Sequence, residues 1–180
     1  MSQHMGPFEY AFTHSLVPQS ITEPNGAIRV NEAFSDLLGY SPEELADQAT
    51  WMQLTHPDDV ALSQAHVDAM LSGQSDEANF EKRYLRKDGE TVWVRVQTLL
   101  RRGESGEPLY FITSIIDVSG LKRTELTLAQ SEERFRTLFT SIDQGMALHE
   151  IIVDDAGAPI DYIYLDLNES YTQLLGVTRD

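Results

Sequence analysis

Histidines and paired acidic residues are the groups of this 180-residue chain that could carry catalytic or metal chemistry. A general acid and base must face each other across a site, and metal-binding histidines stand at fixed spacings such as HExxH. Asp58-Asp59 lies at an expected helix start and Asp154-Asp155 in an expected turn. No two histidines stand at a metal-ligand spacing. We therefore predict no catalytic residue and no metal site.

Other kinds of site are excluded by what the sequence lacks. The chain has no cysteine, which rules out disulfides, thiolate metal sites and cysteine nucleophiles and fits a reducing compartment. Gly103-Glu104-Ser105-Gly106 lacks the rest of a phosphate-binding loop. No apolar run approaches the ~18–20 residues that span a bilayer, and no signal peptide opens the chain. We expect a cytoplasmic protein without membrane insertion.

The charge of the chain argues against a nucleic acid partner. The formal net charge is −16, whereas phosphate backbones are bound by clusters of Lys and Arg. A basic face could still meet an acidic partner, or it could simply be solvated, and the sequence leaves both interpretations open. Seven of the thirteen basic residues fall in one short window: Lys82, Arg83, Arg86, Lys87, Arg95, Arg101 and Arg102.

The elements that must position any site begin with a hairpin. Residues 15–24 and 27–31 are short extended runs separated by Asn25-Gly26, which tolerates the positive φ of a tight turn. Asn31 follows as an N-cap, because its side-chain oxygen can accept a free amide of the first helical turn. The apolar residues behind it have helical spacing, and Gly39 ends the helix.

Two further helix starts follow. Ser41 and Glu44 have the spacing of a capping box. His56 precedes a proline and reads as a structural cap of a long helix, which should run from about residue 58 to residue 71 and end at Gly73.

After Gly73 the hydrophobic period changes to two, which indicates strands. The strands are expected at residues 79–86, 90–102 and 109–118, the first two joined by a turn at Lys87-Asp88-Gly89. The order of elements is then β-β-α-α-α-β-β-β. It predicts an α+β fold with a five-stranded antiparallel sheet and helices on one face.

A helix is expected again from Leu121, where Leu121, Leu128, Phe135 and Ile142 recur every seven residues. This apolar row would be costly in water, so it should pack on a neighbouring element or on a second chain. A homodimer is expected on this basis. The alternative is that Phe135 and the residues after it pack on a following domain.

The sequence also contains a repeat. "NEAFSDLLGYS" at residues 31–41 returns as "NESYTQLLGVT" at residues 168–178, an offset of 137. "FEYAFT" at residues 8–13 returns as "FRTLFT" at residues 135–140, an offset of 127. The ten additional residues fit a longer hairpin around "DDAGAP" at residues 154–159. We therefore expect a second copy of helix, strand, turn, strand and capped helix.

Four stretches in order resemble those of PAS domains, which are sensory modules. They are "NEAFSDLLGYSPEEL", "HPDD", "EKRYLRKDGETVWV" and "FITSIIDVSGLKRTE". The resemblance covers about residues 8–125, and the stretch from "SEERFRTLF" onward resembles the start of a second PAS domain. We expect a tag or a disordered start at residues 1–7, a PAS sensor domain at 8–120, a linker or signalling helix at 121–134, and an incomplete second PAS domain at 135–180.

The resemblance implies a pocket between the inner face of the sheet and the helices. Each residue implied as lining could equally be ordinary core packing. The residues implied by position are Phe34, Leu38, Leu54, Val67, Tyr84, Val96, Thr113 and Ile115.

The resemblance also implies a relay from the last strand to the next domain. Asp117-Val118-Ser119 matches the family's Asp-x-Thr/Ser junction, which the family links with Trp93; a plain helix cap is the alternative. In the linker helix, Leu121, Leu128 and Phe135 would contact a partner or a neighbouring domain.

The function implied is a non-catalytic sensory or dimerisation module of a bacterial signal-transduction protein. A small molecule could be its ligand. The output domain in the same polypeptide would be a histidine kinase of a two-component system or an enzyme of cyclic diguanylate metabolism. The alternatives are a pocketless interaction module that sets dimer geometry and a haem-based redox or gas sensor. No cofactor is identified: a flavin-cysteine adduct needs a cysteine, and His66 does not have the spacing of the haem-binding histidine.

Overall fold

The structure, a computed structural model, describes residues 6–48 and 51–176. The chain divides into two compact units, the first ending at Lys122 and the second beginning at Arg123. The expectation for residues 1–7 falls mostly on residues outside the described range; Pro7 already begins a helix. No helix in the described ranges combines the length and the apolar composition needed to cross a bilayer.

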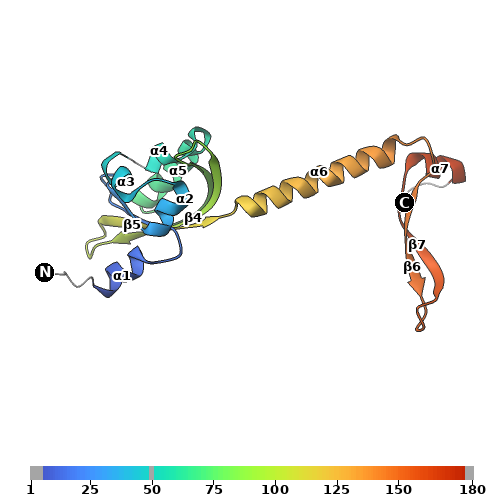
Figure 1. The fold of residues 1–180 in the computed structure, drawn as a ribbon, viewed down its shortest axis with the longest axis horizontal. Coiled ribbons are helices and arrows are strands. Elements are labelled where there is room, and N and C mark those ends of the chain that lie inside the picture. The colour runs from blue at the N-terminus through green and yellow to red at the C-terminus, as the bar shows by residue number, and fades with distance from the viewer. Residues whose placement is uncertain (1–5, 49–50, 177–180) are drawn as a thin grey trace. The chain divides into compact units, whose positions relative to one another are not determined.

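The described part of the first unit is an α+β fold, as predicted. Five strands form one antiparallel sheet in the order β2-β1-β5-β4-β3. Figure 1 shows the helices α2 to α5 gathered together beside this sheet. The elements in chain order are α1 (Pro7–Thr13), β1 (Gln19–Thr22), β2 (Ile28–Val30), α2 (Glu32–Leu38), α3 (Pro42–Gln48), α4 (Trp51–Leu54), α5 (Pro57–Leu71), β3 (Glu77–Leu85), β4 (Thr91–Arg102) and β5 (Pro108–Asp117).

The described residues of the second unit form a hairpin and a short helix. β6 (Ala147–Val153) pairs with β7 (Pro159–Leu167), and α7 (Glu169–Leu175) follows. The longer hairpin expected around residues 154–159 is confirmed. Asp154 closes its turn by accepting from the amides of Ala156 and Ala158 at 2.9 and 2.8 Å. A single helix, α6 (Ser119–Ser141), runs from the end of β5 into this unit.

The predicted helix caps are confirmed in the geometry. The amide of Glu44 donates to Ser41 Oγ at 3.3 Å, and Glu44 Oε2 accepts from the amide of Ser41 at 2.9 Å, which makes a capping box. His56 Nδ1 accepts from the amide of Asp58 at 3.3 Å and caps α5. Gly39 ends α2 with φ of 77°, a conformation that favours glycine.

Asn31 does more than cap α2. Its Oδ1 accepts from the amides of Phe34, at 3.0 Å, and Gln19, at 2.9 Å. Its amide nitrogen donates to the carbonyls of Val17, at 2.8 Å, and Ser15, at 3.4 Å. One buried side chain therefore joins the loop before β1, the start of β1 and the first turn of α2.

Asn168 repeats this pattern in the second unit. Its Oδ1 accepts from the amides of Tyr171, at 2.9 Å, and Met146, at 2.7 Å. Its amide nitrogen donates to the carbonyls of Gln144, at 2.8 Å, and Ile142, at 3.3 Å. The partners lie 127 residues from their counterparts before the hairpin and 137 residues after it. The offsets found in the sequence are thus offsets of equivalent hydrogen bonds.

The interior of the first unit consists of two apolar clusters on the inner face of the sheet. β4 supplies inward side chains in strict alternation, as the period of two predicted. The smaller cluster contains Met70, Leu100 and Phe111, with Val67 and Ala78 against it. The larger cluster contains Phe34, Leu38, Leu45, Leu54, Tyr84, Val92, Val94, Val96 and Ile115.

Candidate functional site

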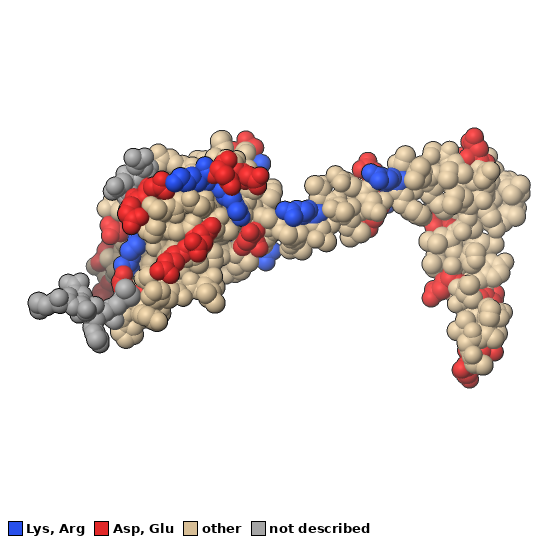
Figure 2. All heavy atoms as spheres, in the orientation of Figure 1, with Lys and Arg blue, Asp and Glu red and all other residues tan. Residues whose placement is uncertain are grey.

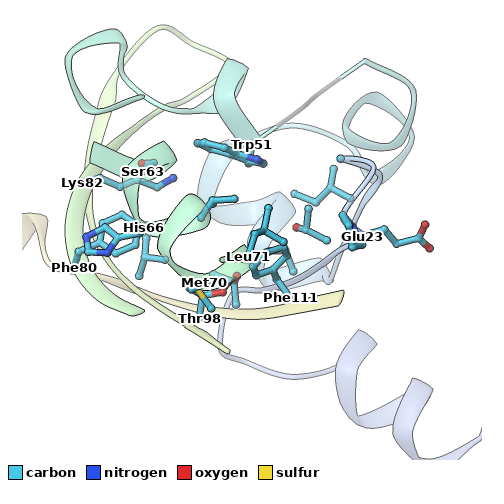
Figure 3. A pocket seen from close by; sticks show the side chains of 18 of the residues that line it. Glu23, Trp51, Ser63, His66, Met70, Leu71, Phe80, Lys82, Thr98 and Phe111 are labelled. Carbon is cyan, nitrogen blue, oxygen red and sulfur yellow. Dashed lines mark hydrogen bonds between the residues drawn. The ribbon is translucent and has the colours of Figure 1, made fainter. Parts of the chain in front are cut away.

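A cavity of about 100 Å³ lies where the two clusters of the first unit meet. Its walls come from β1, the turn before β2, α4, α5 and the inner face of β3, β4 and β5. Figure 3 shows Trp51 across the cavity from Thr98 and Phe111. The volume is below the ~300–1,000 Å³ of pockets for drug-sized ligands, so it suits a ligand of a few heavy atoms.

The residues expected to line the pocket fall into two groups. Val67, Tyr84, Val96 and Thr113 line the cavity. Phe34, Leu38, Leu54 and Ile115 do not line it and are packed in the larger cluster, each at most 3% exposed. Phe34 and Leu38 of α2 and Leu54 of α4 are packed there with Ile115 of β5. The cavity extends instead to the turn before β2, where Glu23, Pro24 and Gly26 line it.

Lys82 is a cavity residue that the sequence analysis placed only in the basic window. Its side chain comes from β3, and the residue is 3% exposed. Its Nζ donates to Thr55 Oγ1 at 3.0 Å and lies 4.4 Å from the ring centroid of Tyr84 and 5.4 Å from that of Trp51. Burial lowers the pKa of Lys82 to about 7, and the charge of Asp59 acts in the opposite direction. The sequence did hold the signal: Lys82 stands two residues from the inward Tyr84, and strand side chains alternate.

His66 also lines the cavity. Its ring stacks on Phe80, with 4.2 Å between ring centroids and 16° between ring planes. Both residues lie beside Lys82 in Figure 3. Among the described residues, no group of three or more His, Asp or Glu side chains gathers as a metal site would.

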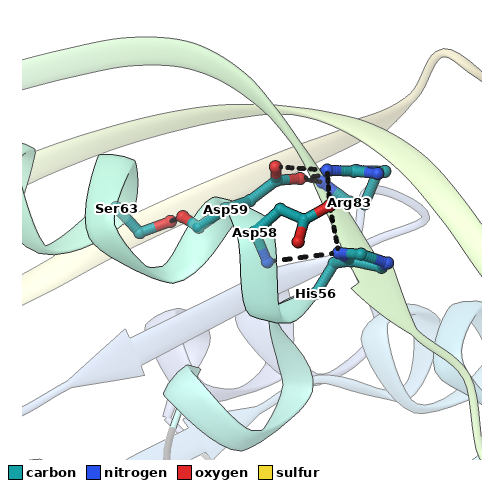
Figure 4. Close-up of polar contacts among 5 residues, drawn as sticks. All are labelled: His56, Asp58, Asp59, Ser63 and Arg83. Carbon is teal, nitrogen blue, oxygen red and sulfur yellow. Dashed lines mark hydrogen bonds and ion pairs between the residues drawn. The ribbon is translucent and has the colours of Figure 1, made fainter.

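An ion-pair cluster fixes the start of α5 to β3 (Figure 4). Asp59 Oδ2 accepts from the backbone amide of Arg83 at 2.7 Å and from its Nε at 2.9 Å, while Oδ1 accepts from Nη2 at 2.7 Å. Asp58 accepts from the same Nη2 at 3.2 Å. The guanidinium of Arg83 holds the pKa of Asp59 below its ordinary value, and these carboxylates raise that of Arg83. The sequence predicted the helix start at Asp58-Asp59 but not the ion pair of Asp59 with Arg83, because no local pattern pairs residues 24 positions apart.

The three residues implied in the relay are brought together at the end of β5. The amide of Trp93 donates to Ser119 Oγ at 3.0 Å, and the carbonyl of Trp93 accepts from the amide of Val118 at 2.9 Å. Asp117 Oδ1 accepts from the amide of Ser119 at 2.8 Å. The Ser119 hydroxyl thus joins β4 to the start of α6. The Arg83 guanidinium lies 5.3 Å from the ring centroid of Trp93.

The predicted partner-contacting residues of α6 are half exposed within the chain. Leu121 is 51%, Leu128 59% and Phe135 52% exposed. Phe135 stacks on the buried Phe139 at 5.5 Å between ring centroids. The homodimer expected from this row stays a prediction.

The basic window does not form an unbroken basic face. Figure 2 shows acidic and basic side chains intermixed on the visible face of the first unit. The acidic-partner interpretation loses its support, because most of these residues are paired within the chain. The pairs are Arg83 with Asp58 and Asp59, Arg86 with Asp117, Lys87 with Glu44, Arg95 with Glu81, and Arg102 with Asp76.

Curated proteins are similar to this chain in sequence. The chain is 37% identical over 128 residues to the probable diguanylate cyclase DgcE of Escherichia coli (strain K12), which covers 71% of the chain and only 12% of that protein. It is 29% identical over 192 residues to a blue-light-activated histidine kinase of Brucella anthropi, covering 99% of the chain and 37% of the kinase.

A solved structure and two family profiles agree with these relatives. The structure is that of a sensory box histidine kinase/response regulator from Burkholderia thailandensis E264, with a TM-score of 0.58 and 26% identity, covering 73% of this chain and 99% of that one. A profile described as PAS fold matches residues 27–115, and one described as PAS domain matches residues 133–180. The chain therefore belongs to the PAS domain family.

Proposed function

We propose that the first unit is a non-catalytic sensor whose cavity controls the start of α6, and through it an output domain of the same polypeptide. The observation that carries this proposal is the position of Arg83. Its guanidinium is bound to the N-terminus of α5, which walls the cavity, and also covers the ring of Trp93. Trp93 in turn is hydrogen-bonded to Ser119 and Val118 at the start of α6.

The proposed relay has three steps. A ligand in the cavity displaces α5, which contributes Ser63, His66, Val67 and Met70 to the wall. The displacement moves the carboxylates at the start of α5 and therefore the guanidinium that they hold. Because packed side chains have discrete arrangements, a shift at this arginine repositions the indole and the residues hydrogen-bonded to its backbone.

The output domain is proposed from the relatives alone. The named relatives are a probable diguanylate cyclase and a histidine kinase, and the chain spans 12% and 37% of their lengths. We propose that the chain is the sensory part of a multidomain signalling protein with an output of one of these kinds.

The relay can be tested in the 180-residue chain by hydrogen exchange. Arg83→Gln removes the ion pairs and the contact with the indole, so amide exchange across residues 117–125 should rise several-fold. The control is Lys87→Met, which breaks a surface ion pair on the neighbouring turn and should leave that segment unchanged. Faster exchange at the start of α5, with unchanged exchange at residues 117–125, would contradict the relay.

The junction can be tested in the full-length signalling protein. Asp117→Ala removes the acceptor for the Ser119 amide and should change output activity several-fold, while the free energy of unfolding falls by only about 1 kcal/mol. A large loss of stability with unchanged output would instead assign Asp117 a purely structural role.

We also propose that α6 has a second role, in dimerisation, because Leu121 and Leu128 are more than half exposed and stand seven residues apart. Sedimentation of the chain should then give a dimer that Leu128→Glu dissociates. Dimers with a dissociation constant in the low micromolar range persist at a chain concentration of ~100 μM. A monomeric wild-type chain at that concentration would therefore exclude this role.

A further inference from the structure

Lys82 gives the cavity of the first unit a cationic group, and its Nζ has no ion-pair partner among the described residues. Lys82 Nζ has one hydrogen-bond acceptor, Thr55 Oγ1, and two aromatic neighbours, Tyr84 and Trp51. Among the described residues, no carboxylate lies within ion-pair distance of it. An ammonium has three donors, and a buried charge is costly unless it is paired. This lysine therefore has unused capacity to bind an anion that enters the cavity.

The rest of the cavity limits what that anion can be. Hydroxyl residues Ser20 and Thr22 line it from β1, and the Thr98 hydroxyl accepts from Thr113 at 2.9 Å. The apolar wall comes from Met70 and Phe111, together with their neighbours on α5 and β4. One ammonium balances one negative charge, so a dianionic phosphate would remain uncompensated here. A monoanion with a short hydrocarbon part matches both walls and the volume of about 100 Å³.

We propose that the cavity binds a short aliphatic monocarboxylate, with its carboxylate on Lys82 Nζ and its hydrocarbon part against Met70 and Phe111. This proposal rests on the sensory function proposed above and names the chemical class of its ligand. A carboxylate accepting from an ammonium makes a charge-assisted hydrogen bond, which is about twice as strong as a neutral one. The ligand would replace the ion pair that the protein does not supply.

Butyrate is the probe, and butyramide is its neutral counterpart of nearly the same shape. Each is titrated into the ¹⁵N-labelled 180-residue chain at constant ionic strength, and amide shifts are followed by NMR. Butyrate should move the amides of cavity residues, and butyramide should bind at least about tenfold more weakly, since a hydrogen bond to a charged group contributes roughly 1.5–3 kcal/mol.

Lys82→Met keeps an unbranched side chain, one atom shorter, and removes the charge, so it should weaken butyrate binding by at least about tenfold. Lys87→Met, on the exposed turn of the same strand pair, should bind butyrate like the wild type. A measurement on the wild type serves if Lys82→Met does not fold. Because the pKa of Lys82 in the empty cavity is about 7, butyrate affinity should fall as the pH rises above 7, by at least about tenfold in all.

Other ionisable groups near Lys82 must be separated from it in that pH series. Asp59 on α5 stays ionised, because Arg83 lowers its pKa, and Tyr84 on β3 stays neutral, because burial raises its pKa. His66 on α5 and Glu23 at the turn before β2 also line the cavity. The variants His66→Asn and Glu23→Gln should keep this fall in affinity.

The outcomes distinguish this proposal from the sensory function beneath it. No shifts with ~100 mM butyrate, equal binding of butyramide, or full butyrate affinity in Lys82→Met each overturn the carboxylate proposal. If butyramide nevertheless moves the amides of Trp93 and Ser119, the relay survives without it. If butyrate binds through Lys82 and these two amides do not move, the ligand class stands and the relay fails.

Discussion

The two copies of the Asn-capped hairpin have the same hydrogen bonds at the asparagine but differ in the burial of the helix that follows it. Asn31 and Asn168 are both almost fully buried, at 1% and 2% exposure. Beyond them the copies diverge. Leu38 of the first copy is fully buried, whereas its counterpart Leu175 is 52% exposed and the adjacent Leu174 is 77% exposed.

The difference teaches which features are local. The cap and hairpin form from partners within about 25 residues, and both copies contain them. Burial of the helix needs strands that arrive much later in the chain. In the first unit β4 and β5 provide that surface, whereas the described residues of the second unit contain only the two-stranded sheet of β6 and β7. Equal local structure therefore coexists with very unequal burial.

The largest expected difference between the copies is at the aromatic position. Phe34→Ala should lower the free energy of unfolding of the first unit by about 3–5 kcal/mol, because it leaves a cavity in a packed core. Tyr171→Ala, the matched change, should leave the unfolding of the first unit within about 0.5 kcal/mol. Urea unfolding followed by Trp fluorescence measures both, since Trp51 and Trp93 lie in the first unit. Equal losses would mean that the two units fold as one.

The second prediction concerns the ionisable residue in the interior of the first unit. The pKa of Lys82 is about 7 when folded and 10.5 as an ordinary lysine, so between these values the unfolded chain binds a proton that the folded chain lacks. The free energy of unfolding should therefore rise with pH from 7 to 10, by up to about 4 kcal/mol. Nearby Asp59 stays ionised in this window, and Tyr84 stays neutral in the folded chain; its ordinary pKa of 10.0 means that its ionisation in the unfolded chain opposes the rise only near pH 10.

The measurement for Lys82 is the difference between wild type and Lys82→Met across that pH range. Subtracting the variant removes the titration of tyrosines and other lysines elsewhere. Parallel pH profiles of the two proteins would show that Lys82 titrates normally and is not buried in solution.

The third prediction compares the two caps. Asn31→Ala leaves the amides of Gln19 and Phe34 without their acceptor and should lower the stability of the first unit by about 2 kcal/mol. Asn168→Ala breaks the same bonds in a segment that is mostly exposed, so only local exchange should increase. Hydrogen exchange at the Phe34 and Tyr171 amides measures both effects. Similar protection of the two amides in the wild type would contradict the expected difference in stability between the two caps.

The smallest expected effect is at the surface. Lys87→Met breaks the exposed ion pair with Glu44 and should change stability by less than about 0.5 kcal/mol. Thermal unfolding in low and high salt checks this result. A loss above 1 kcal/mol would mean that this turn contributes to the core of the first unit.

Most of the fold could be predicted from the sequence, because its determinants are local. Period-two runs gave the strands, and Asn31, Ser41 and His56 marked helix starts by residue type alone. The pairing of β1 with β5 follows from none of these patterns, since about 90 residues separate the strands. The sequence therefore predicted five strands in one sheet but not their order in it.

The site was less predictable, because a cavity depends on what fails to fill it. The spacing of apolar residues predicts an interior position for Phe34 and for Tyr84 alike, yet of the two only Tyr84 lines the cavity. The sequence analysis placed Lys82 in the basic window, although the alternation of side chains along a strand places it on the inner face of the sheet. Its neighbour Arg83 lies on the other face of the strand and forms an ion pair with Asp59 of α5. No local sequence pattern predicts that pair, because the two residues are far apart in the chain.

The self-contained bonding of Asn31 has a consequence during synthesis on the ribosome. All its hydrogen-bond partners lie within residues 15–34, so the hairpin of β1 and β2 with its Asn31 cap can form as soon as that segment emerges from the ribosome. At ~5–20 residues per second, the strands up to Val118 follow about 4–17 s later. For that interval α2 presents Phe34 and Leu38 to water, as α7 presents Leu174 and Leu175 in the structure. Exposed apolar side chains make a nascent chain in this state prone to aggregation until the strands have been synthesised.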